Sequence, residues 1–465
     1  MDPRYDVLDD AAALAREFLD TLAERPVGAR ADIHELRERL ARPLSDDGED
    51  ARAVLADLAR DVEPGLIASA GPRYFGFVIG GSLPASVGAD WLTSAWDQNA
   101  GIYAAGPAAS VVEEVAAAWL LELLDLPATA SVGFVTGAQM ANFSCLAAAR
   151  HAVLARAGWD VGARGLSGAP EITVVVSDEA HATVLTALGY LGLGRERNLR
   201  IPADAQGRMR VDQLEGILGR VDGPLIVCLQ AGNVNTGAFD DAVRATEAVR
   251  RHPNTWVHVD GAFGLWARSS ADLASAAAGL EAADSWAVDG HKWLNVPYDS
   301  GFAIVADPAA HVAALAPAAG AYIQYAAAER DPFNFVPEYS RRARGFATYA
   351  AIRELGREGV AGMIERCCTI AAHMADRLRV VEGIEVLNDV VLNQVLVRFH
   401  PSAGGDVDAH TRSVVARIQA DGGAWLGATT WHGMAAMRIS VSNWSTSQAD
   451  ADRAVELILR SAADA

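Results

Sequence analysis

The chain has 465 residues, of which 51% are hydrophobic and 21% are charged, and its formal net charge is −20. This length predicts two or three subdomains, and the balance of apolar and charged residues excludes wholesale disorder. The acidic charge argues against a nucleic-acid partner, because phosphates need a basic surface.

Residues 6–70 carry apolar positions every three or four residues, punctuated by Pro26, Pro43 and Pro64. This spacing predicts amphipathic helices. The pattern is carried by the segments 14–24, 33–44 and 51–68. Such helices cannot bury an apolar stripe alone. We therefore expect residues 1–70 to form a helical arm that packs on the main body or on a second subunit.

From about residue 110 onward, helical patterns alternate with short apolar runs rich in β-branched residues. A strand, a glycine turn and a helix are predicted over 131–154, and further strands at 171–178, 224–232, 255–261 and 284–290. This alternation is typical of a mainly parallel sheet with helices on both faces, whose ligands bind beyond the carboxyl ends of the strands. The sequence therefore predicts an α/β fold, with a large domain over 71–340.

After residue 344 the pattern changes. A long helix is predicted over 351–378, followed by strands at 391–399 and 437–444 with helices between and after them. We expect residues 341–465 to form a smaller α+β domain.

Two segments of the large domain place polar residues at strand ends. In WVHVDGAFG an apolar strand ends on Asp260, which is suited to capping the next helix or to holding the protonated pyridine nitrogen of pyridoxal 5′-phosphate (PLP). In DSWAVDGHKWLNVPYDSG, Lys292 lies between an apolar strand and an apolar turn. Apolar surroundings would lower the pKa of a lysine and make it a nucleophile for an aldehyde, and His291 beside it could donate to a phosphate.

Two further segments support a cofactor site. His181 lies where a predicted strand gives way to a helix, as a cap or as a ring that stacks on a flat heterocycle. Gly137, Ala138 and Gln139 would present backbone N–H groups at a helix N-terminus, where phosphate binds favourably. The segment is neither a GxxxxGK[ST] loop nor a GxGxxG motif.

Taken together, these segments resemble the group II PLP-dependent amino-acid decarboxylases, a fold-type I PLP-dependent transferase-like family that includes the aromatic-L-amino-acid decarboxylases. The resemblance is carried by HVDGAFG, DGHKW, SDEAHATV, AGNVNTGAFD and YSRRARGFATYAAIRELGREGV, and runs from about residue 70 to the end. It implies that Lys292 forms the Schiff base, Asp260 contacts the pyridine nitrogen and His181 is the stacking base. It further implies that Ala262 packs under the ring, that His291 lies near the phosphate, and that the protein is a homodimer.

The resemblance also bears on the reaction and on the substrate. It places Tyr322 in a loop where tyrosine favours simple decarboxylation, and Arg344 near the substrate carboxylate. Phe77 and Asn99 fall in segments that line the substrate pocket in the aromatic branch. Arg73 could pair with an acidic substrate, or could serve with Asn99 only to hold the loop together.

The expected activity is thus decarboxylation of an L-amino acid of aromatic, acidic or small polar type. The alternatives are transamination, carbon–carbon lyase chemistry or aldehyde-forming oxidative deamination, and a catalytically silent PLP-binding protein. Histidines without HExxH spacing and cysteines without CxxC spacing predict no metal site. The absence of a signal-peptide pattern and of a long apolar run predicts a cytoplasmic protein without a membrane partner.

Overall fold

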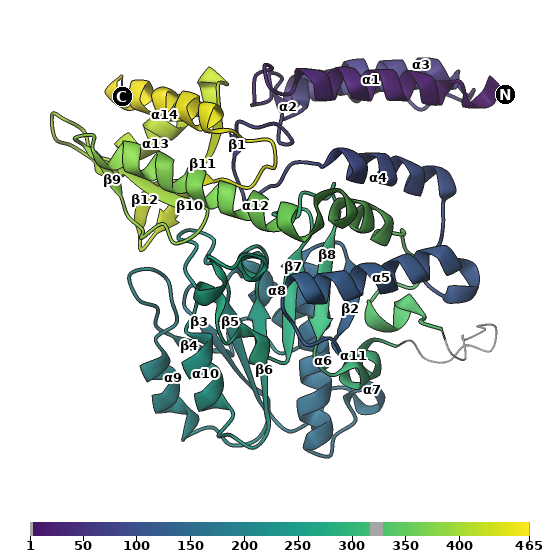
Figure 1. Cartoon of the computed structure of the whole chain (residues 1–465), viewed down its shortest axis with the longest axis vertical. Coiled ribbons are helices and arrows are strands. Elements are labelled where there is room, and N and C mark those ends of the chain that lie inside the picture. The colour runs from purple at the N-terminus through teal and green to yellow at the C-terminus, as the bar shows by residue number, and fades with distance from the viewer. Residues whose placement is uncertain (1–2, 317–328, 465) are drawn as a thin grey trace.

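The computed structural model describes residues 3–316 and 329–464. The apolar runs predicted as strands form the larger of two sheets, which is mainly parallel (Figure 1). Strand β8 is the exception, because it pairs antiparallel with both β2 and β7. In the order in which they lie side by side, the strands are β2 (Ser131–Val135), β8 (Gly301–Val305), β7 (Ser285–Asp289), β6 (Thr255–Asp260), β5 (Leu225–Gln230), β3 (Thr173–Ser177) and β4 (Leu199–Ile201).

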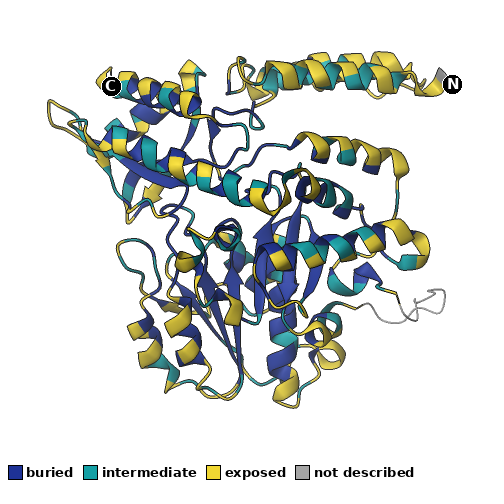
Figure 2. Ribbon diagram, in the orientation of Figure 1, coloured by how far each residue is buried: buried dark blue, intermediate teal, exposed yellow. Residues whose placement is uncertain are grey.

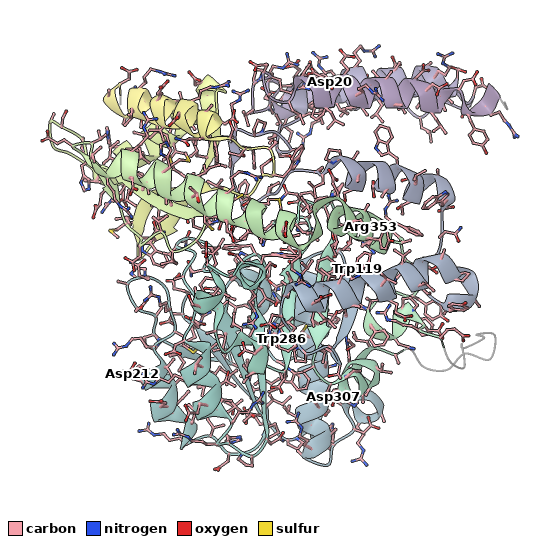
Figure 3. The ribbon with its side chains drawn as sticks, viewed as in Figure 1. Asp20, Trp119, Asp212, Trp286, Asp307 and Arg353 are labelled. Carbon is pink, nitrogen blue, oxygen red and sulfur yellow. The ribbon has the colours of Figure 1, made fainter. Side chains whose placement is uncertain are left out.

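Helices cover both faces of this sheet. Successive side chains of a strand point to opposite faces, so Val174 and Val175 of β3 belong to different cores. Val174 belongs to the core that includes residues of α6 and α8, and Val175 to the core that includes residues of α5, α9 and α10. Trp286 of β7 is fully buried and lies among the strands, whereas Asp212 of α9 lies at the periphery (Figure 3). The helices of this part are α5 (Pro107–Leu123), α6 (Ala138–Arg156), α7 (Val161–Arg164), α8 (Ala182–Tyr190), α9 (Val211–Leu218), α10 (Ala242–Val249) and α11 (Pro308–Leu315).

The smaller sheet contains the predicted C-terminal strands and one short strand from far earlier in the chain. In spatial order its strands are β1 (Tyr74–Phe75), β11 (Trp425–Trp431), β12 (Met434–Ser440), β10 (Gln394–Phe399) and β9 (Ile384–Val386). Strand β1 pairs parallel with β11, and the remaining pairs are antiparallel. Helix α13 (Val407–Asp421) packs on strands β10, β11 and β12, and α14 (Gln448–Ala463) packs on α13 and on α12 (Gly345–Arg379).

The long helix predicted over 351–378 differs from the structure in one respect. Helix α12 (Gly345–Arg379) begins earlier than predicted and is interrupted at Gly356, whose φ of 62° and ψ of −179° are not helical. A positive φ costs glycine little because it has no Cβ, so the chain changes direction there. The segment is therefore two consecutive helices rather than a single one.

The N-terminal helices form as predicted. They are α1 (Val7–Thr21), α2 (Ile33–Leu40) and α3 (Ala51–Val62), and α3 contacts both of the others. They project along the edge of the molecule, followed by α4 (Pro84–Trp96), and their surfaces are largely exposed (Figure 2). Asp61 is the one buried residue of these three helices in the described structure. None of the described helices combines the length and the apolar character that spanning a membrane requires.

Candidate active site

A cavity of about 460 Å³ lies at the carboxyl ends of the larger sheet's strands. Its lining comes from the β2–α6 turn, the β3–α8 connection and the ends of β5, β6 and β7. Because the carboxyl ends of parallel strands meet at the same edge of a sheet, residues far apart in sequence converge there. The predicted residues that line it are Gly137, Ala138, Gln139, His181, Asp260, Ala262, His291 and Lys292.

Lys292 follows β7 closely, and its side chain is one-fifth exposed. Its Nζ lies 2.8 Å from Oδ2 of Asp289, the last residue of β7. Trp293, Leu294 and Val296, which follow the lysine, are buried in the core. The prediction that the Lys292 amine has only apolar surroundings is therefore wrong, because the buried carboxylate of Asp289 pairs with it.

Asp289 connects the lysine to the start of α6. Its Oδ1 accepts a hydrogen bond from the backbone N–H of Ala138, the first residue of that helix, and lies 3.3 Å from Nε2 of His291. His291 Nδ1 accepts from the backbone N–H of Ser300 at 3.2 Å, so the neutral ring carries its proton on Nε2. Burial lowers the pKa of His291, which keeps the ring neutral. The ring of Tyr298 stacks on it at 4.3 Å.

Asp260 ends β6, the strand beside β7, so the predicted proximity of Asp260 and Lys292 at neighbouring strand ends is present in the structure. The Asp260 carboxylate is almost fully buried. Its Oδ1 accepts from the backbone N–H of Ala262 at 3.2 Å, and its Oδ2 from Nδ2 of Asn142 at 3.4 Å. The carboxylate is thus held in place from two sides.

His181 is both a helix cap and a residue of the cavity lining. It is the N-cap of α8, and its Nδ1 lies 2.8 Å from Oγ1 of Thr183. Burial lowers the pKa of His181, and the charges of Lys292 and Arg438 lower it further, while Asp260 opposes them. The imidazole is therefore neutral near pH 7.

The residues predicted to bind substrate lie outside this lining. Phe77 is 58% exposed and packs on the ring of Trp425, with 5.0 Å between ring centroids. Asn99 Oδ1 accepts from the backbone N–H of Gly101 at 3.0 Å, which is the loop-holding alternative. Arg344 Nε donates to Asp299 Oδ1 at 2.6 Å, so its guanidinium is committed to a carboxylate of this chain.

Two more expectations concern neighbouring segments. Arg73 is buried and donates to the backbone carbonyls of Gly423 and Arg25 at 2.6 and 2.8 Å, which favours its structural role over binding of an acidic substrate. Tyr322 lies outside the described residues, and its role stays a prediction.

Sequence reasoning missed two charged residues near the cavity. Asp289 had a usable signal, since it ends an apolar strand just as Asp260 does. Arg438 had none, because it lies inside β12 of the smaller sheet. Arg438 is 9% exposed and donates from Nη1 to the carbonyl of Val234, a lining residue, at 3.1 Å. No carboxylate among the described residues forms an ion pair with it.

The chemistry of this lining fits PLP. The backbone N–H groups at the start of α6 suit the phosphate of PLP. The Asp260 carboxylate suits its pyridine nitrogen, and the Lys292 amine suits its aldehyde. Gly137 keeps the turn before α6 open, because a Cβ there would lie 2.7 Å from Cε1 of His291.

Comparison with known proteins gives a matching family and relatives that match most of the chain. The model of the pyridoxal-dependent decarboxylase conserved domain matches residues 34–400. Aromatic-L-amino-acid decarboxylase of Bacillus atrophaeus is 27% identical over 406 residues, which cover 86% of this chain and 82% of that protein. L-2,4-diaminobutyrate decarboxylase of Rhizobium meliloti (strain 1021) is 28% identical over 448 residues, covering 94% and 86% of the two chains.

Solved structures share the fold. The Oryza sativa TDC solved with PLP and tryptamine superimposes with a TM-score of 0.92 at 23% identity, covering 100% of this chain and 98% of that one. Catharanthus roseus tryptophan decarboxylase, solved with L-tryptophan, gives a TM-score of 0.90 at 18% identity, covering 100% and 99%. The predicted fold class is confirmed. From its matched domain and the decarboxylases that it resembles along its length, the chain belongs to the pyridoxal-dependent decarboxylase family, whose members are PLP-dependent carboxy-lyases acting on amino acids.

Proposed function

We propose that the protein converts an L-amino acid to the corresponding amine and CO₂, with Lys292 as the residue whose amine bonds to the PLP aldehyde. The observation that carries this proposal is that Lys292, Asp260 and His181 line a single cavity. A feature of the sequence supports the proposal further. Lys292 is the only lysine of the chain, and all its other residues with a permanently basic side chain are arginines. Arginine stays protonated in proteins and cannot replace a lysine that must act as a nucleophile.

Each remaining residue has a proposed role. Gly137, Ala138 and Gln139 hold the phosphate through the α6 N-terminus, with His291 beside it. Ala262 packs under the ring, His181 stacks on its opposite face, and Asp260 holds a proton at the pyridine nitrogen. When bound, PLP supplies an electron sink for the electron pair that the departing CO₂ leaves behind.

Arg438 is proposed as the partner of the substrate carboxylate, in place of Arg344. Burial lowers the pKa of Arg438 to about 10, yet it remains charged at neutral pH. A buried cation without a carboxylate partner among the described residues is costly unless a ligand supplies an anion. The carbonyl of Val234 holds one arm of its guanidinium beside the cavity. Its planar fork suits the two oxygens of a carboxylate.

A direct screen of amino acids identifies which side chain the substrate carries. Relatives at similar identity are named for aromatic amino acids, for L-2,4-diaminobutyrate and for acidic amino acids. A panel of these three classes, together with small polar amino acids, tests the range that the sequence suggests.

Aldehyde formation is a specific second candidate. The 4-hydroxyphenylacetaldehyde synthase of Rhodiola rosea is 25% identical over 88% of this chain. The tyrosine at position 322 favours simple decarboxylation over this alternative. Product analysis separates them, since one reaction yields an amine and CO₂ and the other yields an aldehyde.

The first test is a spectrum of the purified protein with PLP, before and after borohydride, beside the Lys292→Ala variant. We expect a visible absorption band that reduction removes and that the variant lacks. Because the chain has one lysine, intact-mass analysis should then show a single reduced adduct per chain at Lys292. A wild-type protein that forms no band with added PLP would contradict the proposal, as would an adduct that persists in Lys292→Ala.

A further inference from the structure

A buried chain of hydrogen bonds lies behind the cavity and branches at Asn142 of α6. Asn142 Oδ1 is 2.8 Å from Nε2 of His258. Its Nδ2 is 3.4 Å from Oδ2 of Asp260 and 3.4 Å from Oγ1 of Thr183. Asn142 and His258 have no exposed surface, so these contacts are made away from water. Two residues of the cavity lining, Asp260 and Thr183, are thereby joined through a single amide.

The chemistry of the partners fixes the direction of each bond. The Asp260 carboxylate only accepts, so the amide NH₂ of Asn142 faces it and Oδ1 faces His258. Oδ1 also only accepts, so His258 carries its proton on Nε2 and accepts at Nδ1. The hydroxyl of Ser285, 2.9 Å away, donates to that Nδ1. Ser285 Oγ in turn accepts from Nε1 of Trp256 at 2.8 Å, and an indole N–H can only donate. The far end of the chain is compatible with the direction that Asp260 sets, because a hydroxyl that accepts from the indole still has its own proton to donate to His258.

Burial keeps His258 in the form that this direction needs. It lowers the pKa of His258 to about 3, so the ring is neutral and has one donor and one acceptor. A protonated ring would have two donors, so the Ser285 oxygen would have to accept from the ring and from the indole together and turn its own proton elsewhere. A fully satisfied, directional network of this kind is rigid, because reversing any member leaves a buried polar group unpaired.

The second branch of the chain reaches His181. Because the amide of Asn142 donates to Thr183 Oγ1, the Thr183 hydroxyl is free to donate to Nδ1 of His181, which is 2.8 Å away. The backbone N–H of Thr183 points at the same nitrogen at 3.4 Å. Nδ1 of His181 is therefore an acceptor, and the proton of the neutral ring resides on Nε2, across the ring from Thr183.

We propose that Asn142 is a positioning residue that, through Thr183, fixes His181 as the Nε2–H tautomer and couples it to Asp260. His181 then meets a ligand in the cavity as a hydrogen-bond donor, suited to a carboxylate or carbonyl oxygen, and it does not take up a proton there. This assignment deepens the proposed function and rests on it for the identity of the ligand. It departs from the role of base that the family resemblance implies for His181.

The tautomer can be measured directly in the protein labelled with ¹⁵N-histidine, prepared without PLP. Long-range ¹H–¹⁵N correlation spectra show which ring nitrogen carries the proton, and the His181→Gln and His258→Gln variants assign the two rings by loss of their signals. We expect Nε2–H for both rings in the wild-type protein. A proton on Nδ1 of either ring would overturn the proposal.

The Asn142→Asp variant, nearly identical in shape, tests whether Asn142 sets the tautomer. A carboxylate there replaces the amide donor, so the Thr183 hydroxyl must donate to it and is lost as a donor to Nδ1 of His181. If the new carboxyl group shares a proton with the neighbouring Asp260, that proton points toward Asp260. The same carboxyl group can then still accept a hydrogen bond from the Thr183 hydroxyl. We expect the Nδ1 resonance of His181 to move toward that of a nitrogen without a hydrogen bond, because only the backbone N–H of Thr183, at 3.4 Å, still donates to it. His258, still facing an acceptor, keeps Nε2–H as an internal control. A folded variant in which the Nδ1 resonance of His181 is unchanged would overturn the role of Asn142.

A second pair of variants keeps the proposal testable if Asn142→Asp does not fold. Thr183→Val removes the hydroxyl, so the Nδ1 resonance of His181 should move toward that of a nitrogen without a hydrogen bond. Thr183→Ser keeps the hydroxyl and should restore the wild-type resonance. Identical spectra for the valine and serine variants would overturn the proposed hydrogen bond from the Thr183 hydroxyl to Nδ1 of His181. Both measurements use protein without PLP, so they succeed or fail independently of the Lys292 adduct.

Discussion

Arg438 is a buried cation beside the cavity, and no described carboxylate neutralises it. If it binds the substrate carboxylate, Arg438→Gln should lower kcat/KM by roughly 30- to 160-fold, which is about 2–3 kcal/mol for a lost charge-assisted hydrogen bond. Arg344→Gln serves as the matched variant, since Arg344 already pairs with Asp299. Steady-state kinetics should show the larger loss for Arg438→Gln. A larger loss for Arg344→Gln would mean that Arg344 binds the substrate carboxylate, as the sequence first indicated.

Asp289 places a carboxylate against the α6 N-terminus, where a phosphate is expected to bind. Two anions at one helix end repel each other, so Asp289→Asn should bind a phosphate ligand more tightly. The gain should be about 1 kcal/mol, or roughly fivefold. Pyridoxine 5′-phosphate is the suitable probe, because it has no aldehyde and cannot react with Lys292.

Titration calorimetry of protein without PLP measures this affinity. Asp299→Asn is the control, because that carboxylate pairs with Arg344 and is not part of the cavity lining. Weaker binding by Asp289→Asn than by the control would mean that the carboxylate supports the phosphate site rather than competing for it.

At the scale of the elements, the helical arm of residues 6–70 exposes apolar side chains that the single chain does not cover. Leu8, Leu19, Ile33 and Leu58 are all at least 40% exposed. Helices α1 and α3 also line a cavity of about 630 Å³. A second copy of the chain, as the family resemblance implies, would bury these surfaces and account for their composition.

We therefore predict that Leu58→Asp weakens self-association. A carboxylate buried without a partner costs on the order of 3 kcal/mol, which is roughly a 100-fold rise in the dimer dissociation constant. Sedimentation equilibrium measures that constant. Val380→Asp, at a residue that is 83% exposed beyond the end of α12, is the control and should leave it unchanged. Equal association of the two variants would argue against an interface at α3.

The strands of the larger sheet were predictable because their signal is local. Each is an apolar β-branched run, and the rule that parallel strands end at the same edge brings Asp260 and Lys292 together without further knowledge. Strand β1 was not predictable, since Tyr74 and Phe75 are too few to show an alternation, and their partner strand is at the other end of the chain. Arg438 was missed for the same physical reason: its place beside the cavity depends on how the two sheets pack.

For the whole molecule, acid should reduce stability in a defined window. Burial lowers the pKa of both His258 and His311 from the ordinary histidine value of 6.5 to about 3. The unfolded chain binds these protons below about pH 6.5, whereas the folded chain does not until about pH 3. The stability that the neutral rings contribute is therefore present above pH 6.5 and is lost as the pH falls, by about 1.4 kcal/mol per pH unit for each ring.

Asp240 opposes this loss. Burial raises its pKa to about 6 from 3.8, so between pH 6 and pH 4 it binds a proton only in the folded chain. For these three groups together the loss over that window is about 1.4 kcal/mol per pH unit, and removing Asp240's contribution with Asp240→Asn should about double it. Urea unfolding at pH 6, 5 and 4 provides the measurement. Unfolding midpoints that do not change across this window in either protein would contradict the prediction.

The pairing of β1 with β11 has a consequence for synthesis. Residues 74–75 leave the ribosome long before the strand that pairs with them exists, so they must remain an unpaired edge segment until nearly the whole chain has emerged. The larger sheet, complete by residue 305, can fold in the meantime, since folding during translation proceeds from the N-terminus. Lys292 is therefore translated long before Arg438, but the turn that follows it is held through Asn295 by the backbone of Ser442 and Trp444, which come after Arg438. We expect a nascent chain stalled before β11 to form the strands of the larger sheet while the turn after Lys292, and with it the cofactor site, stays incomplete.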